Sequence, residues 1–255
     1  MMEERIEKAF AVPPDTPVII RNSNGSVLVR AGSGSSGRAL VKRTVEPDLP
    51  HTKYVEIEID QGPPLVIRSC YSLSRVRASV DMEVTLPPGI KALEIETING
   101  NIVVSDMNCR IRASSSNGFI RTSGGGGPLD LHTRNGMLDV SGEAVISCLE
   151  TLNGSIRVDM GGVSGDPATI STVSGSILIC VEDGFCADFE AVTGRGAIHT
   201  KGLTVVSSIT GPGLMRGTIG SSAGRFRVSS RIGDITLTRS SGLQRRDEPG
   251  DGRAV

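Results

Sequence analysis

Aromatic side chains and net charge are both scarce in this sequence. Aromatic residues make up 3% of its 255 residues, tryptophan is absent, and the formal net charge is −1 at pH 7. So few aromatic rings leave little surface on which nucleic-acid bases or sugars could stack. A balanced charge gives no overall field that would attract nucleic acid or an anionic membrane. We therefore expect no nucleic-acid partner.

Long hydrophobic runs are also missing. No apolar run approaches the roughly 20 residues that cross a bilayer. The first residues, MMEERIEKAF, contain no apolar core of signal-peptide length, and no lipidation motif is present. The sequence as it stands predicts a cytoplasmic protein without a membrane span; removal of an upstream targeting segment is the alternative.

Motifs for metal binding are absent in the same way. The histidines are His51, His132 and His199, and neither an HExxH motif nor a Cys/His cluster accompanies them. We expect surface histidines rather than metal ligands, and no cofactor. The cysteines form no CxxC pair, and their odd number favours reduced thiols over a disulfide framework. They are Cys70, Cys109, Cys148, Cys180 and Cys186.

Catalytic motifs are missing as well, since the sequence has neither a GxSxG nucleophile elbow nor a P-loop. Carboxylates expected on outer faces are mixed with arginines, which is typical of a solvated sheet surface with cross-strand pairs. We therefore expect no catalytic residues. The carboxylates are Asp130, Asp139, Glu150, Asp159 and Glu190; the arginines are Arg112, Arg121, Arg134 and Arg157.

Glycine, by contrast, is abundant, with 32 residues, and it recurs in a strand–turn–strand pattern. The stretch LEIETINGNIVV, residues 93–104, predicts two strands joined by an Asn-Gly turn. Subtraction gives spacings of 18, 18, 18, 21, 19, 17 and 22 between successive turn glycines. Such a period, with two short strands in each repeat, indicates a β-solenoid of about eight rungs. The turn glycines are Gly100, Gly118, Gly136, Gly154, Gly175, Gly194, Gly211 and Gly233.

Side-chain alternation keeps the same phase in these units, which predicts stacked rows inside a coil. Apolar residues recur four positions before the residue that precedes each turn glycine, and Ser or Thr recurs two positions before that residue. A further aliphatic residue follows each glycine. In the unit with its turn at Gly211, Val206 and Leu214 hold the two apolar positions. The asparagines directly before the glycines predict a hydrogen-bonded amide ladder: Asn99, Asn117, Asn135 and Asn153. The later units have Ser174, Thr193, Thr210 and Ile232 there instead.

An outward row directly before this ladder position carries aliphatic residues in four successive units. A contiguous exposed apolar strip is a candidate partner interface. The alternatives are that a loop or the C-terminal tail covers the strip, or that the alignment slips where the units are irregular. The residues are Leu152, Val173, Val192 and Ile209.

The region before the repeats contains alternating stretches such as RVRASVDMEVTLPPGI and a further copy of the unit, NSNGSVLV, at residues 22–29. We expect residues 1–90 to form an antiparallel β-region that caps the first rung, since open rungs expose unpaired backbone. Residues 91–238 would be the repeat array, and the polar residues 239–255 a disordered tail.

The order of VDMEVTLPPGI, LEIETINGNIVV and the later NG-x-I-x-V units resembles the DUF4097 family, which carries the family label "putative adhesin". The stretches KAFAV and VIIRNSNGSVLVRAG also fit the opening strands of that family, so the resemblance covers roughly residues 5–238. It implies a β-solenoid-like fold and no catalytic residues to transfer.

Three functional hypotheses follow. The leading one is a non-catalytic β-solenoid that serves as an interaction, scaffold or adhesin-like surface, with a protein partner or self-association. The second is a carbohydrate-active or glycan-binding β-helix, which would need a groove with converging carboxylates and an aromatic platform. The third is a scaffold that polymerises end to end, like the bacterial bactofilins.

Overall fold

The computed structural model describes residues 2–46, 55–71, 77–164, 167–221 and 223–240. Every secondary-structure element in these residues is a β-strand, and the strands form one mixed sheet that is not closed. The predicted all-β class is therefore confirmed. The described part of the chain contains no helix long and apolar enough to cross a membrane. His51 and the predicted tail beyond Ser240 lie outside the described residues.

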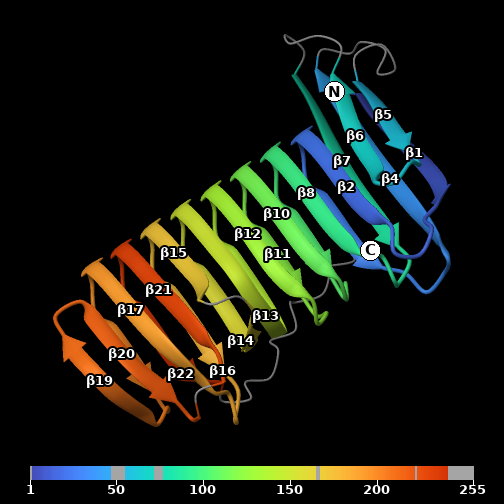
Figure 1. Cartoon of the computed structure of the whole chain (residues 1–255). Coiled ribbons are helices and arrows are strands. Elements are labelled where there is room, and N and C mark those ends of the chain that lie inside the picture. Colours follow the sequence, from blue (N-terminus) through green and yellow to red (C-terminus); the bar gives the residue numbers. More distant parts are fainter. Residues whose placement is uncertain (1, 47–54, 72–76, 165–166, 222, 241–255) are drawn as a thin grey trace, which may run out of the picture.

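The strands that precede the turns pair in parallel and form what we call the first stack (Figure 1). Ile111, for example, is in register with Leu93 on one side and Leu129 on the other. In spatial order the first stack contains β2 (Pro17–Asn24), β8 (Ala92–Asn99), β10 (Arg110–Asn117), β12 (Pro128–Asn135), the second half of β13 (Leu138–Asn153), β15 (Ala168–Ser174), β21 (Arg225–Ile232) and β17 (Ala187–Arg195).

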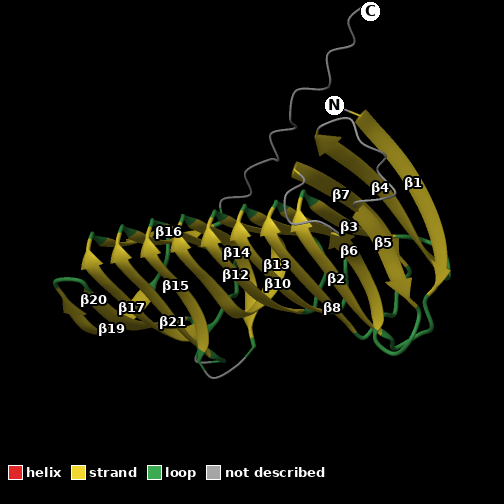
Figure 2. Ribbon diagram, turned by 90° about the horizontal axis from the view of Figure 1, so that it is seen from above, coloured by secondary structure: helices red, strands yellow, loops and turns green. Residues whose placement is uncertain are grey.

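The strands that follow the turns form a second parallel stack, and Figure 2 shows the turns along one edge of the molecule. In the same spatial order this second stack contains β3 (Val27–Ala31), β9 (Ile102–Ser105), β11 (Ile120–Ser123), the first half of β13, β14 (Ile156–Val163), β16 (Ile177–Val181), β22 (Ile235–Arg239) and β18 (Ile198–Lys201).

Rows of aliphatic side chains fill the space between the two stacks. Alternate residues of a strand face the same side, so one parity is buried in every strand. One row from the first stack is inaccessible to solvent, and each such fully buried aliphatic side chain contributes roughly 1.5–3 kcal/mol to stability. That row contains Ile95, Ala113, Leu131, Leu149, Ile170 and Val228.

A row of hydroxyl side chains is buried beside the aliphatic rows, and its hydrogen bonds run from one unit to the next. Ser115 donates to the carbonyl oxygen of Gly100, Thr133 to that of Gly118 and Thr151 to that of Gly136, each over 3.0 Å. These bonds remove the desolvation cost of burying a hydroxyl. They also tie each strand to the turn of the preceding unit.

The glycine at each turn allows the units to stack closely. A Cβ atom built on Gly136 would lie 2.0 Å from the carbonyl oxygen of Gly118, and one on Gly154 would lie 1.9 Å from that of Gly136. No side chain fits at that distance, so the requirement for glycine at Gly136 comes from backbone approach between neighbouring units.

The turn asparagines form a row of amide hydrogen bonds on the surface. Asn117 donates from Nδ2 to Oδ1 of Asn99 over 2.8 Å, Asn135 to Asn117 over 2.9 Å and Asn153 to Asn135 over 2.9 Å. Asn99 donates in turn to Asn24, which extends the row into the upstream copy of the unit.

The spatial order of the units differs from their order in the chain, contrary to our alignment. The last strands, β21 and β22, lie between β15/β16 and β17/β18, so that Thr172 and Thr193 both flank Ser230. The segment between β18 and β21 in the chain does not form a rung. Val205–Gly211 (β19) and Leu214–Ile219 (β20) form an antiparallel hairpin, and β20 pairs antiparallel with β17 at the end of the stack.

The turn chemistry explains why this segment departs from the pattern. Gly213 follows Pro212 and has φ +72°, a left-handed conformation that suits a tight chain reversal. The predicted rung with its turn at Gly211 is therefore wrong. Val206, which the alignment placed in a buried row, is largely exposed, and Leu214 lies on β20 rather than in the stack.

The preceding unit, AVTGRGAIHT, is out of register with our alignment by two residues. Gly196, rather than Gly194, stacks at the corner: a Cβ atom on it would lie 2.2 Å from the carbonyl oxygen of Gly233. Thr193 belongs to the buried hydroxyl row and donates to the same carbonyl over 2.9 Å. Our alignment placed the two additional residues of this unit after the turn glycine, whereas in the structure they lie before it.

The N-terminal residues continue both stacks and then extend into antiparallel strands. β6 (Leu65–Tyr71) pairs in parallel with β2 and antiparallel with β5 (Val55–Asp60). β7 (Arg77–Leu86) pairs in parallel with β3 and antiparallel with β4 (Ser36–Glu46), which pairs with β1 (Met2–Ala11). The upstream unit at residues 22–29 thus pairs directly with β8 and β9. The division of the chain at residue 90 stays a prediction.

We expect Gly136→Ala to destabilise the protein by at least about 3 kcal/mol, because the new methyl group would contact rigid backbone rather than a movable side chain. Gly211→Ala is the matched control, since nothing lies within 4 Å of a Cβ atom built there and its φ is not in the left-handed region. Chemical denaturation measures both values. Equal small losses in the two variants would contradict the close stacking of the turns.

We expect Asn117→Ala to lower the free energy of unfolding by roughly 1–2 kcal/mol, about twice the loss from Asn153→Ala. Asn117 takes part in two amide–amide hydrogen bonds and Asn153 in one. Urea denaturation of the two variants tests this ratio. A larger loss for Asn153→Ala would show that the amide row does not stabilise the turns.

Candidate functional site

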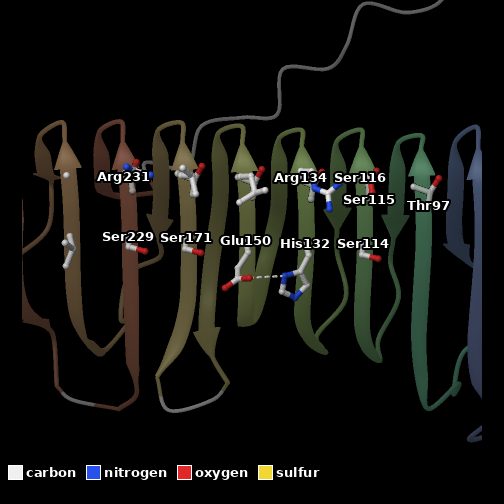
Figure 3. A pocket seen from close by; sticks show the side chains of 18 residues that line it. Thr97, Ser114, Ser115, Ser116, His132, Arg134, Glu150, Ser171, Ser229 and Arg231 are labelled. Carbon is white, nitrogen blue, oxygen red and sulfur yellow. Dashed lines mark ion pairs between the residues drawn. The ribbon is translucent and has the colours of Figure 1, made fainter.

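A shallow trough of about 740 Å³ runs across the outer face of the first stack, over β10, β12, β13, β15 and β21 (Figure 3). Two rows of side chains form its floor. The first row contains Ser114, His132, Glu150, Ser171 and Ser229 in adjacent strands, and the second row lies one residue pair nearer to the turns. Serine predominates in the first row, which keeps the floor low.

The second row has an apolar centre between two cations. The register places Arg134, Leu152, Val173 and Arg231 on four adjacent strands, β12, β13, β15 and β21. Leu152 is 46% exposed and Val173 39% exposed, and both arginines are exposed. The trough therefore presents a basic–apolar–apolar–basic pattern across the strands.

The two arginines of this row differ from several others on the surface. Arg112 pairs with Asp130 at 2.7 Å, and Arg121 pairs with Asp139 at 3.0 Å. Within the described part of the chain, Arg134 and Arg231 form no ion pair. Neither charge is therefore neutralised by an ion pair with the described residues.

The structure does not place the four predicted strip residues in one row. Leu152 and Val173 are neighbours, but Val192 is in register with Ser229 and so belongs to the first row. Ile209 lies on the hairpin strand β19 and pairs with Arg216. All four side chains are exposed, and their role as an interface stays a prediction.

A cluster of ionisable groups lies at the β12–β13 end of the trough. His132 Nε2 is 2.5 Å from Asp130 Oδ1, and His132 Nδ1 is 3.3 Å from Glu150 Oε2. Cys148 completes the cluster, because its sulfur and one ligand atom each of Asp130 and His132 all lie within 4.8 Å of one another. Figure 3 shows His132 and Glu150 turned toward each other on neighbouring strands.

The regular 18-residue register places Cys148 opposite Asp130, and a β-bulge lies directly before Cys148. Leu129 is in register with Ile146, but the next residue, Asp130, is in register with Cys148, so β13 contains one additional residue at this point. Strand alternation turns Cys148 outward, because its neighbour Leu149 is buried. The additional residue of the bulge allows Ile146 to be buried too, so the bulge changes the register of the residues before Cys148.

The charges of the cluster shift two pKa values in opposite directions. Burial and the nearby carboxylates of Glu150 and Asp130 raise the pKa of the Cys148 thiol to about 12. Partial burial acts to raise the pKa of Asp130 too, but hydrogen bonds from Arg112 and His132 outweigh it and hold that pKa below the usual value. At neutral pH the cluster thus combines a protonated thiol with an ionised Asp130.

The chemistry of the trough floor differs from that of a carbohydrate-cleaving groove. Among the described residues that line it, Glu150 is the sole carboxylate, and none is Phe, Tyr or Trp. Paired carboxylates and a sugar-stacking ring are the features that the glycan hypothesis requires.

Sequence reasoning identified parts of this site but could not assemble it. The outward positions of Arg134, Leu152 and Val173 follow from strand alternation, whereas the position of Arg231 beside Val173 depends on the insertion of β21. The 18 residues between Asp130 and Cys148 equal the spacing of the turn glycines, and this was the signal that could have placed Cys148 beside Asp130. The five cysteines, all within the described residues, are free thiols.

Comparison with known proteins gives weak likenesses to solved structures. No protein-family model matches the chain, and no curated protein sequence matches it. A "putative adhesin" from Bacteroides fragilis is 12% identical, with a TM-score of 0.45 over 92% of this chain and 97% of that one. A "putative lipid binding protein" from Parabacteroides distasonis is 13% identical, with a TM-score of 0.43 over 94% of this chain and 97% of that one.

A third structure, a "putative cell adhesion protein" from Clostridium sporogenes, is 11% identical, with a TM-score of 0.37 over 93% of this chain and 100% of that one. At such identities and with TM-scores below 0.5, these likenesses identify neither a family nor a function.

We expect Asp130→Asn to destabilise the protein at neutral pH and to have little effect in acid. A carboxyl group whose pKa is lower in the folded state contributes its stability in full above the unfolded pKa, about 3.8, and loses it as the pH falls through the folded pKa. Urea denaturation of the wild type and of Asp130→Asn, from neutral pH down to acid, measures the difference in their free energies of unfolding. A difference that does not shrink in acid would show that the Asp130 charge is not stabilised by Arg112 and His132.

Proposed function

We propose that the protein is a non-catalytic β-solenoid whose trough binds an extended segment of a protein partner. The solenoid description is supported by the two parallel stacks, in which strands 18 residues apart pair in register from β8 to β13. Binding is supported by one observation above all: two exposed aliphatic side chains lie between two arginines that form no ion pair with the described residues.

The spacing of the second row suggests the pattern of the bound segment. Neighbouring strands lie about 4.8 Å apart, so three strand steps separate Arg134 from Arg231 by roughly 14 Å. An extended peptide advances about 3.4 Å per residue, so residues four apart span nearly the same distance and face the same side. We infer a segment with acidic residues at positions i and i+4 and an apolar residue at i+2, lying across the strands.

This pattern favours a protein partner over the other two hypotheses. A peptide strand supplies both the two carboxylates and an apolar side chain that could cover Leu152 and Val173. End-to-end polymerisation has less support, because the β19–β20 hairpin covers β17 at one end, and antiparallel strands extend the other end (Figure 1). Membership of the DUF4097 family and a cytoplasmic location belong to the same proposal and rest on the sequence features above.

Binding of designed peptides tests this function. The probe is a fluorescently labelled peptide of the form acidic-x-Leu-x-acidic. The control peptide has lysine at both acidic positions. We expect anisotropy to detect binding of the acidic peptide, weakening as salt is added. Arg134→Glu/Arg231→Glu and Val173→Glu should each weaken it at least about tenfold.

Ile98→Glu is the matched control for Val173→Glu. Ile98 is 53% exposed and lies in the same outward row on β8, outside the residues that line the trough. Binding that survives Val173→Glu, or that Ile98→Glu weakens equally, would contradict the proposed surface. Binding of the lysine peptide with equal affinity would do the same.

Light scattering over a concentration series determines whether the bound segment belongs to a second copy of the chain. We expect a monomer for the wild type, for Val173→Glu and for Ile98→Glu. A wild-type dimer that Val173→Glu alone converts to a folded monomer would overturn the proposal in favour of self-association. Repeating the peptide assay on a chain ending at residue 240 tests whether the C-terminal residues compete for the trough.

A further inference from the structure

The cluster at the β12–β13 end of the trough contains the donor atoms of a transition-metal site. Asp130, His132 and Cys148 each present one ligand atom within 4.8 Å of the others. Carboxylate oxygen, imidazole nitrogen and thiolate sulfur are the three ligand types that bind zinc in proteins. The thiolate and imidazole favour zinc over magnesium or calcium, which prefer oxygen ligands alone.

The distances require only small movements for a tetrahedral ion. Zinc binds nitrogen and oxygen at about 2.0–2.1 Å and sulfur at about 2.3 Å, so its ligand atoms lie roughly 3.3–3.6 Å apart. In the structure His132 Nε2 and Asp130 Oδ1 are 2.5 Å apart. An ion would therefore replace the proton between these two atoms and separate them by roughly 0.8 Å. All three side chains lie on the partly exposed outer face, where such rotations meet little resistance.

The surroundings of the cluster match the second layer of a metal site. A histidine that binds a metal through one nitrogen commonly donates its other N–H to a carboxylate, which fixes the ring orientation. Glu150 Oε2 lies 3.3 Å from His132 Nδ1 and can accept this hydrogen bond. Arg112 holds the other oxygen of Asp130, Oδ2, at 2.7 Å, which leaves Oδ1 directed toward the histidine.

We propose that Asp130, His132 and Cys148 bind one Zn²⁺ ion, with Glu150 orienting His132 and Arg112 orienting Asp130. Three protein ligands leave the fourth tetrahedral position open for water or for a donor from a partner. Cys148 lies opposite Asp130 because the two residues are 18 positions apart, which is also the spacing of the turns here, and it faces outward because its neighbour Leu149 is buried.

The protons balance in a simple way. On binding, the Cys148 S–H bond breaks, its proton passes to the solvent and the sulfur–zinc bond forms. In neutral His132 the proton between Nε2 and Asp130 Oδ1 also passes to the solvent, while Nδ1 takes one up and donates it to Glu150, so the Nε2 lone pair binds the ion with no net release from the ring. Asp130 is already ionised. From the neighbouring strand β15, Thr169 and Ser171 lie opposite Cys148 and Glu150 and add no charge. Because one thiol proton is released, zinc affinity should fall about tenfold for each unit of pH decrease around neutrality.

Titration of the reduced, full-length chain with Zn²⁺ alone tests the site. We expect one ion per chain by calorimetry, together with a higher unfolding temperature. Co²⁺ used in its place should give the thiolate-to-metal charge-transfer absorption that reports a sulfur ligand. Cys148→Ser and His132→Gln should each abolish the Co²⁺ band, and Glu150→Gln should weaken zinc binding by roughly 10–100-fold.

Cys180→Ser and His199→Gln are the matched controls. Cys180 is another half-buried thiol, in register with the carboxylate residue Asp159, and His199 is an exposed histidine on β18. Both variants should bind zinc as the wild type does. Three results would each overturn the proposal: no binding by the wild type, binding that survives Cys148→Ser and His132→Gln together, or loss of binding in either control. Circular dichroism confirms that each variant is folded.

Discussion

The close approach of backbone at the turns is the constraint on which the rest of this structure depends. At Gly136 and Gly154 there is space for a hydrogen atom and for nothing larger. This contact fixes the distance between neighbouring units, and the fixed distance aligns the buried hydroxyl row, the aliphatic rows and the turn amides. The same register extends to the outer face, where it places residues of successive units side by side at strand spacing.

Both the trough and the ionisable cluster are consequences of this register. Asp130 and His132 are separated from Cys148 and Glu150 by 18 residues in the chain, and the stacking turns that separation into contact between adjacent strands. A repeat of this kind brings distant residues together without a compact catalytic motif. A surface site can therefore be built from positions that look unrelated along the sequence.

The sequence was sufficient to predict the strands, the buried rows and the phase of the units between Gly100 and Gly175, because strand alternation and the Asn-Gly turns are local signals. It was not sufficient to predict spatial order after Gly175. A strand–turn–strand unit has no local feature that specifies which unit lies next to it. The two-residue shift at Gly196 and the one-residue bulge before Cys148 were not predicted for a related reason. In both cases the neighbouring strand determines where the additional residues lie.

The central claim is that the last unit of the chain inserts between two earlier ones and so completes the trough. Chemical crosslinking tests it most directly, with cysteine pairs at positions 173 and 231 and at positions 173 and 192, a short thiol-reactive reagent, and mass spectrometry of the linked peptides. Val173 and Arg231 are on adjacent strands, so we predict efficient linkage of Val173→Cys/Arg231→Cys and little linkage of Val173→Cys/Val192→Cys. Efficient linkage of the second pair alone would show that the units stack in chain order, and the trough described here would not exist.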